Sequence, residues 1–163
     1  MRYFLIDRVL CVNAGKSITA IKNVSLSEDI FTDHFFGNPV MPGAMQIESM
    51  AQAATVLLEL SSKFKYKALL VMVNNTKFRQ IVSPGDTMEI QMLQLSSEDG
   101  IVQLDGTIRV KGKKVTSGRL VFALQPIDEF YPPNTRHLVM SMYQNFLKGA
   151  DLIGVTIPDN EYG

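Results

Sequence analysis

Two kinds of apolar pattern divide this chain into predicted elements. The stretch 44–60, AMQIESMAQAATVLLEL, is rich in Ala, Leu and Met and holds no Gly or Pro, which predicts a helix. Its apolar positions cover nearly the whole circumference, so we expect the helix to be buried. Its polar exceptions follow i, i+4, i+7, i+11 spacing: Glu48, Gln52, Thr55 and Glu59. They form one narrow stripe, which indicates that this side of the helix meets a site, a partner or water.

The other apolar segments have the short length and partial alternation of β-strands. Short polar links separate several of them, which predicts hairpin turns and an antiparallel meander. The expected strands span 3–14, 17–26, 68–73, 86–95, 101–110 and 115–124, with turns at 13–16, 83–86, 97–100 and 111–114. A buried helix with these strands predicts an α+β domain, in which a curved antiparallel sheet wraps around a long central helix.

The last part of the chain has a different character. Pro132-Pro133 interrupts the pattern, and 135–148 has the spacing of a short amphipathic helix. A lone helix of that length is unstable without packing, so we expect it to dock on its own core, on a neighbouring protomer or on another protein. The end, 158–163, is expected to fray. We therefore divide the chain into a domain over 1–126 and a C-terminal extension over 127–163.

Charge and composition exclude several classes of protein. The 16 basic and 16 acidic residues cancel, which argues against a general nucleic-acid binder. No apolar run reaches the length of a membrane span, and charges at Asp7 and Arg8 end the first apolar run too early for a signal peptide. We therefore expect a cytoplasmic protein. A single cysteine and two histidines, His34 and His137, leave little to bind a metal, so no metal site is expected.

The candidate chemistry lies in 33–52, DHFFGNPVMPGAMQIESMAQ. His34 stands in a loop over 29–42 that its Gly and Pro residues make rigid. Glu48 follows 14 residues later, inside the predicted buried helix. A carboxylate in such a place costs free energy unless it is paired or protonated, so a functional role for Glu48 gains weight.

Gly43 opens that helix and adds a third element. Backbone N–H groups in the first turn lack partners within the helix, and the helix dipole adds partial positive charge there. An oxygen that gains negative charge during a reaction is stabilised at such a place. A base, an acid and an oxyanion donor on one loop–helix unit suit proton abstraction next to a carbonyl group.

These motifs resemble the active-site signature of the 3-hydroxyacyl-acyl carrier protein (ACP) dehydratases of the FabZ type, in type II fatty acid synthesis. The resemblance covers about residues 3–126. The matching segments are His34-Phe35, the Pro-Val-Met-Pro-Gly turn at 39–43, Ile47-Glu48 with the continuation 50–54, Lys77-Phe78-Arg79, Pro84-Gly85-Asp86 and Phe122-Ala123-Leu124.

The resemblance implies a hot-dog fold and a hydro-lyase that converts (3R)-3-hydroxyacyl-ACP to trans-2-enoyl-ACP. It implies His34 as the base, Glu48 as the acid, the Gly43 N–H as oxyanion donor and the Val40 carbonyl as the group that orients the imidazole. Gln52 either holds the Glu48 carboxyl or is simply an inward polar residue. No metal or redox cofactor is implied, because the substrate arrives on the phosphopantetheine arm of ACP.

The resemblance also implies partners. Family members are dimers, commonly assembled as trimers of dimers, with His34 and Glu48 of one site on different protomers. A basic patch could dock the acidic carrier protein, although each residue alone could equally be a solvated charge. Its candidate members are Lys63, Lys65, Lys67, Lys77 and Arg79.

Two departures from the family pattern and three alternatives remain open. Asp33 stands where glycine is usual and Phe36 where proline is usual, which affects the expected substrate range more than the reaction. The alternatives are a hot-dog thioesterase, a non-catalytic acyl-binding subunit and a dehydratase that also isomerises the double bond. Retention of both His34 and Glu48 argues against the second, and Glu in place of Asp at the acid position argues against the third.

Overall fold

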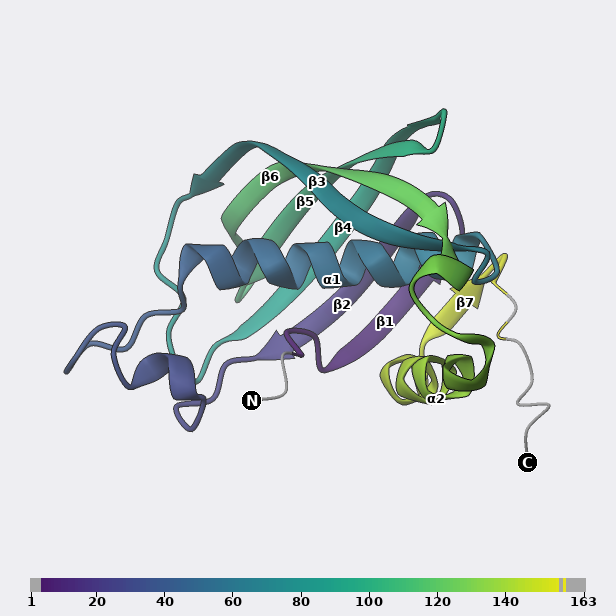
Figure 1. Cartoon of the computed structure of the whole chain (residues 1–163). Helices are drawn as coiled ribbons and strands as arrows, with labels where there is room; N and C mark the ends of the chain where they lie inside the picture. Colours follow the sequence, from purple (N-terminus) through teal and green to yellow (C-terminus); the bar gives the residue numbers. More distant parts are fainter. Residues whose placement is uncertain (1–3, 156, 158–163) are drawn as a thin grey trace.

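The computed structural model describes residues 4–155 and 157. A curved sheet wraps around the long helix α1 (Gly43–Ser61), as Figure 1 shows. The sheet has the strand order β3-β6-β5-β4-β2-β1-β7. Its strands are β1 (Arg8–Asn13), β2 (Ser17–Asn23), β3 (Tyr66–Phe78), β4 (Thr87–Glu98), β5 (Ile101–Val110), β6 (Lys113–Pro126) and β7 (Asp151–Ile153).

The α+β prediction is confirmed, with differences at the edges of the sheet. Helix α1 extends one residue beyond the predicted 44–60 at each end. Strand β1 begins only at Arg8, because residues 4–7 run as irregular chain and residue 3 lies outside the described residues. Strand β3 is longer than the apolar run 68–73 that predicted it, and forms one edge of the sheet.

Helix α1 packs its apolar side against the concave face of the sheet. Met50, Ala53 and Leu57 are fully buried there, against β4 and β5 side chains such as Met92 and Ile108. Gly106 on β5 permits this close approach, since a Cβ there would lie 2.5 Å from the Met50 sulfur. Burial of this apolar area is the main stabilising term of the fold.

The C-terminal extension packs on the chain's own core. It contains short 3-10 turns η2 (Ile127–Glu129) and η3 (Pro133–Thr135), helix α2 (Arg136–Leu147) and strand β7. Tyr143 and Leu147 of α2 are 4% exposed each and belong to the hydrophobic core. Strand β7, which the sequence did not predict, pairs parallel with β1. The predicted frayed end at 158–163 lies outside the described residues.

A short 3-10 turn, η1 (Asp29–Phe31), begins the long loop between β2 and α1. This loop leads to the N-terminal end of α1, at the left of Figure 1. Helix α2 lies near the opposite end of α1, beside β1 and β7. In the described part of the chain, no helix combines the length and apolar character needed to span a membrane.

Candidate active site

The loop before α1 fixes the ring of His34. The Nδ1 atom of His34 lies 2.8 Å from the Val40 carbonyl oxygen, and the Val40 N–H donates back to the His34 carbonyl at 2.9 Å. A carbonyl oxygen can only accept, so Nδ1 must carry the proton and donate it. In the neutral imidazole the Nε2 atom then keeps its lone pair, which is the state a general base requires. The expected contact with Val40 is therefore present.

The aromatic residues after His34 are exposed. The Phe35 ring stacks on the imidazole, with 4.2 Å between ring centroids. Phe36 is 97% exposed. An effect of Phe36 on the substrate range, which the sequence suggested, would therefore need a second protomer packed against this loop.

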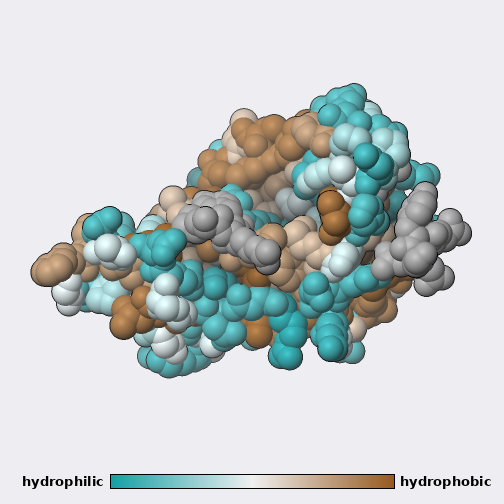
Figure 2. All heavy atoms as spheres, turned by 60° about the horizontal axis from the view of Figure 1, so that its bottom comes forward, coloured by the Kyte–Doolittle hydropathy of each residue, from teal (hydrophilic) through white to brown (hydrophobic). Residues whose placement is uncertain are grey.

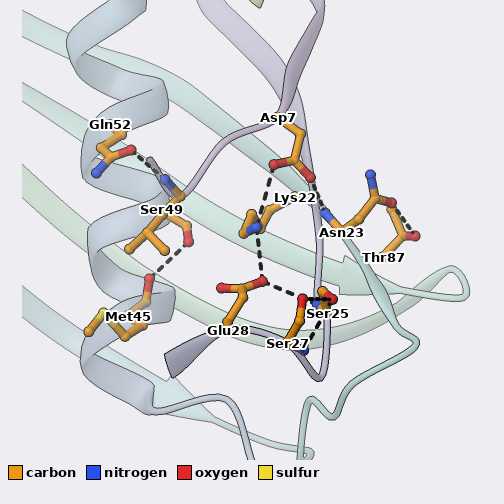
Figure 3. Close-up of polar contacts among 11 residues, drawn as sticks. Asp7, Lys22, Asn23, Ser25, Ser27, Glu28, Met45, Ser49, Gln52 and Thr87 are labelled. Atoms are coloured by element: carbon orange, nitrogen blue, oxygen red, sulfur yellow. Dashed lines mark hydrogen bonds and ion pairs between the residues drawn. The ribbon is translucent and has the colours of Figure 1, made fainter. Parts of the chain in front are cut away.

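An ion-pair cluster around the buried Lys22 anchors the start of the same loop (Figure 3). Lys22 on β2 is 7% exposed and lies between two carboxylates, Asp7 at 3.4 Å and Glu28 at 3.0 Å. Asp7 also accepts a hydrogen bond from the Asn23 N–H. Since Glu28 directly precedes η1, the loop that carries His34 leaves the sheet from a fixed point.

A second buried pair holds the turn between His34 and α1. Gln46 donates from Nε2 to the Met41 carbonyl at 3.1 Å and accepts a hydrogen bond from Thr116 on β6. Gln46 is 3% exposed and Thr116 is fully buried. The Met41 N–H donates to Val82 at 2.8 Å. Sequence reasoning missed this arrangement, although a further polar residue in an otherwise apolar helix was a signal for Gln46.

Gly43 is the first residue of α1, as predicted, and the Phe78 ring of β3 covers it. A Cβ at Gly43 would lie 2.7 Å from the Phe78 ring, so the ring would have to move to admit any larger residue. The first turn of α1, with its backbone N–H groups, therefore begins at a position that only glycine can occupy in this packing. These N–H groups are the candidate oxyanion donors.

Glu48 accepts a hydrogen bond from Gln52. Of the two interpretations of Gln52, this contact favours the one in which it holds the Glu48 carboxyl. The Gln52 amide donates to Glu48 at 3.0 Å and accepts the Leu5 N–H at 2.8 Å, the contact drawn at Gln52 in Figure 3. The backbone donor fixes which way the amide points, so its NH₂ group faces the carboxylate. Glu48 is half-buried and lines a cavity of about 230 Å³.

The fully buried carboxylate of the polar stripe is Glu59. It pairs with Lys67 at 2.6 Å and accepts a hydrogen bond from the Tyr143 hydroxyl of α2. Burial alone would lower the pKa of Lys67, but attraction to Glu59 outweighs it and the pKa is raised. Because Lys67 is paired with Glu59, it does not belong to the predicted docking patch. The other candidate members of that patch are exposed: Lys63, Lys65, Lys77 and Arg79.

Within one chain the candidate base and acid belong to separate arrangements. His34 is bonded to the loop before α1, and Glu48 is bonded to Gln52 one turn further along the helix. Across residues 4–155 and 157, no three His, Cys, Asp or Glu side chains gather as a metal site.

Solved structures define the class to which this fold belongs. A hot-dog-like protein from Thermanaerovibrio acidaminovorans has a TM-score of 0.59 at 18% identity, covering 83% of this chain and 93% of its own. The dehydratase heterocomplex ApeI:P from Xenorhabdus doucetiae has a TM-score of 0.63 at 21% identity, covering 84% and 90%. The chain therefore has the hot-dog fold.

Sequence comparison then gives the family. Residues 1–119 match the family model of the FabA-like domain, and the chain belongs to this family. It is 40% identical over 119 residues to the 3-hydroxyacyl-(acyl-carrier-protein) dehydratase FabZ of Rickettsia conorii, covering 72% of this chain and 82% of that protein. Identity to the FabZ of Rickettsia massiliae is 42% over 113 residues, covering 68% and 78%.

Proposed function

We propose that this protein dehydrates (3R)-3-hydroxyacyl-ACP to trans-2-enoyl-ACP, with His34 as base and Glu48 as acid. The observation that carries this assignment is the hydrogen bond from His34 Nδ1 to the Val40 carbonyl. In the neutral imidazole this bond leaves Nε2 without a proton, on a loop that directly precedes the helix N-terminus proposed as the oxyanion site. The similarity to FabZ enzymes over most of their length supports the substrate class.

In the proposed reaction, His34 Nε2 takes the proton from C2 of the acyl group. The thioester oxygen gains negative charge and accepts a hydrogen bond from the Gly43 N–H. The C3–O bond breaks as Glu48 gives its proton to the departing hydroxyl, so water and the enoyl thioester are released. His34 returns its proton to solvent and Glu48 regains one. Each acid–base step of this kind contributes about 10²–10⁴-fold to the rate, and the proposed chemistry needs no metal or redox cofactor.

We further propose that the working unit is a homodimer formed through β3. On the family resemblance, three such dimers assemble into a trimer of dimers. Strand β3 forms an edge of the sheet and exposes apolar side chains, including Val71 at 55% and Met72 at 53%. Figure 2 shows a broad hydrophobic area at the upper left of its view. An exposed, apolar edge strand readily pairs with another chain, and a twofold axis across β3 would pair it with its own copy.

The proposal includes a carrier protein as partner and a cytoplasmic location, both on the family resemblance. Exposed Lys63, Lys65, Lys77 and Arg79 supply positive charge for an acidic carrier protein. Because Lys67 is paired with Glu59, it contributes to the stability of the fold instead.

The test is turnover of purified 3-hydroxyacyl-ACP, with the enoyl product and any free thiol measured in the same reaction. We expect enoyl product without thiol release, and His34→Ala and Glu48→Gln to lose at least about 100-fold in kcat. His137→Ala and Glu89→Gln are matched controls, because both residues are exposed and lie outside the proposed site. Activity within tenfold of wild type in either site variant, with an unchanged circular dichroism spectrum, would refute the assignment. Release of thiol without enoyl product would instead indicate a thioesterase.

A further inference from the structure

The cavity beside Glu48 has one wall from the domain and another from the C-terminal extension. Its volume is about 230 Å³. The α1 side consists of the polar stripe, with Glu48, Gln52 and Thr55. The lining also includes apolar side chains, among them Phe4, Met142 and Phe146, together with Lys67 and Tyr143. A cavity lined both by a carboxylate with neighbouring polar groups and by apolar side chains suits a ligand with a polar reacting end and an apolar tail.

Helix α2 is held against α1 firmly enough to form a fixed wall. The Tyr143 hydroxyl donates to the buried Glu59 carboxylate, and the Tyr143 ring lies 5.3 Å from the Phe64 ring. Lys67, which pairs with Glu59, also lies 5.4 Å from the ring centre of Tyr131 in the extension. The extension is thus tied to the C-terminal half of α1 through a buried charge cluster.

Met142 and Phe146 lie four residues apart and share one side of α2, which faces the cavity. The Phe146 ring is half-buried and rests edge-on against Phe4, with 5.6 Å between centroids. Together with Phe4, these two side chains line the cavity that Glu48 also lines. Neither residue belongs to the matched family domain, which ends at residue 119.

We propose that Met142 and Phe146 form the end wall of the acyl-chain pocket and thereby set the longest acyl group that the enzyme dehydrates efficiently. This inference rests on the proposed role of Glu48, because it places the 3-hydroxyl at that carboxylate and the rest of the acyl chain along the stripe. A methylene group is close in size to a water molecule, whose share of liquid volume is about 30 Å³. A cavity of about 230 Å³ therefore accommodates several methylene groups beyond C3.

The experiment measures kcat/KM for 3-hydroxyacyl-ACP substrates of about four to sixteen carbons, in wild type and variants. Burial of each additional methylene is worth about fourfold in an equilibrium constant. Phe146→Ala and Met142→Ala each lengthen the pocket, so the ratio of kcat/KM for fourteen-carbon over eight-carbon substrates should rise about tenfold or more. Phe146→Trp, which fills the space, should lower the same ratio.

Leu138→Ala is the matched control, because Leu138 is also apolar and on α2 but is 61% exposed and does not line this cavity. The ratio should not change in that variant. A ratio within twofold of wild type in both Phe146→Ala and Met142→Ala would overturn the proposal, and so would an equal loss at every chain length.

The Glu48→Gln variant separates this inference from the proposed function. If Glu48→Gln still dehydrates substrate, the assignment of the acid is wrong and the pocket loses its starting point. If Glu48→Gln is inactive, but Phe146→Ala and Met142→Ala keep the wild-type chain-length ratio, the proposed function stands and only the end wall is refuted. Phe146→Leu, a smaller change, provides the same readout if an alanine variant fails to fold.

Discussion

At the scale of single residues, Gln46 is the side chain that connects the fold to the candidate site. Gln46→Leu would leave the Met41 carbonyl and the Thr116 hydroxyl buried without this partner. Each of these two losses costs about 1–3 kcal/mol, so we expect urea unfolding to show a decrease of about 2–6 kcal/mol in the free energy of unfolding. Displacement of the turn before Gly43 should also lower kcat, by up to about 100-fold, with a smaller effect on KM.

Two further variants distinguish positioning from general destabilisation. Ser49→Ala removes another fully buried polar group on α1, whose hydroxyl donates to the Met45 carbonyl of the same helix. It should cost about 1 kcal/mol and leave kcat unchanged. The double variant Gln46→Leu, Thr116→Val removes both partners of the buried bond, so it should regain stability while kcat stays low. Wild-type kcat in Gln46→Leu would show that the turn does not depend on Gln46.

At the scale of elements, Tyr143 of α2 and Lys67 both contact Glu59 of α1. These contacts make the free energy of unfolding depend on pH in the alkaline range. Burial first, and then the negative charge of Glu59, raise the pKa of Tyr143 well above its ordinary value. The pKa of Lys67 is raised as well. Groups with a raised pKa in the folded state stabilise it below their unfolded pKa, near 10 for both, and lose that contribution as the pH rises further. The free energy of unfolding should therefore fall above about pH 10.

Tyr143→Phe tests the contact between Tyr143 and Glu59 directly. Loss of a hydrogen bond to a charged group should lower the free energy of unfolding at pH 7 by about 1.5–3 kcal/mol. The decline above about pH 10 should also become shallower, because one of the two titrations is gone. Tyr66→Phe is the control, since Tyr66 is 43% exposed and should change stability by less than about 0.5 kcal/mol. Equal stability of Tyr143→Phe and wild type would mean that α2 is held by its apolar contacts alone.

The sequence predicts an element or a contact when the residues that form it lie close together in the chain. Helix α1 and the meander carry their own periodic patterns, and the contacts of His34 with Val40 and of Glu48 with Gln52 span only six and four residues. The bonds of Gln46 with Thr116 and of Glu59 with Tyr143 span 70 and 84 residues. No local pattern encodes such pairs. Strand β7 has three residues, too few for a period, and exists because β1 offers it a partner.

At the scale of the whole molecule, the single chain has surfaces that a second copy would complete. Apolar residues on the β3 edge and the exposed Phe35 and Phe36 beside His34 leave hydrophobic area without cover in the chain as described. If the β3 edges pair across a twofold axis, both regions can be buried in one assembly. The loop with His34 of one protomer would then approach Glu48 of the other, which agrees with their separate arrangements within one chain.

Mixing the two inactive variants tests this shared site. When His34→Ala and Glu48→Gln chains exchange freely, about half of the dimers are mixed. In each mixed dimer one site combines the intact His34 of one chain with the intact Glu48 of the other, and the second site has neither. We therefore expect an equal mixture to recover about a quarter of wild-type activity, measured as enoyl-ACP formation after partial denaturation and refolding together. Light scattering on the same samples should show an even-numbered oligomer. If each site lies within one chain, every mixed dimer contains only damaged sites, and the mixture stays as inactive as its parents.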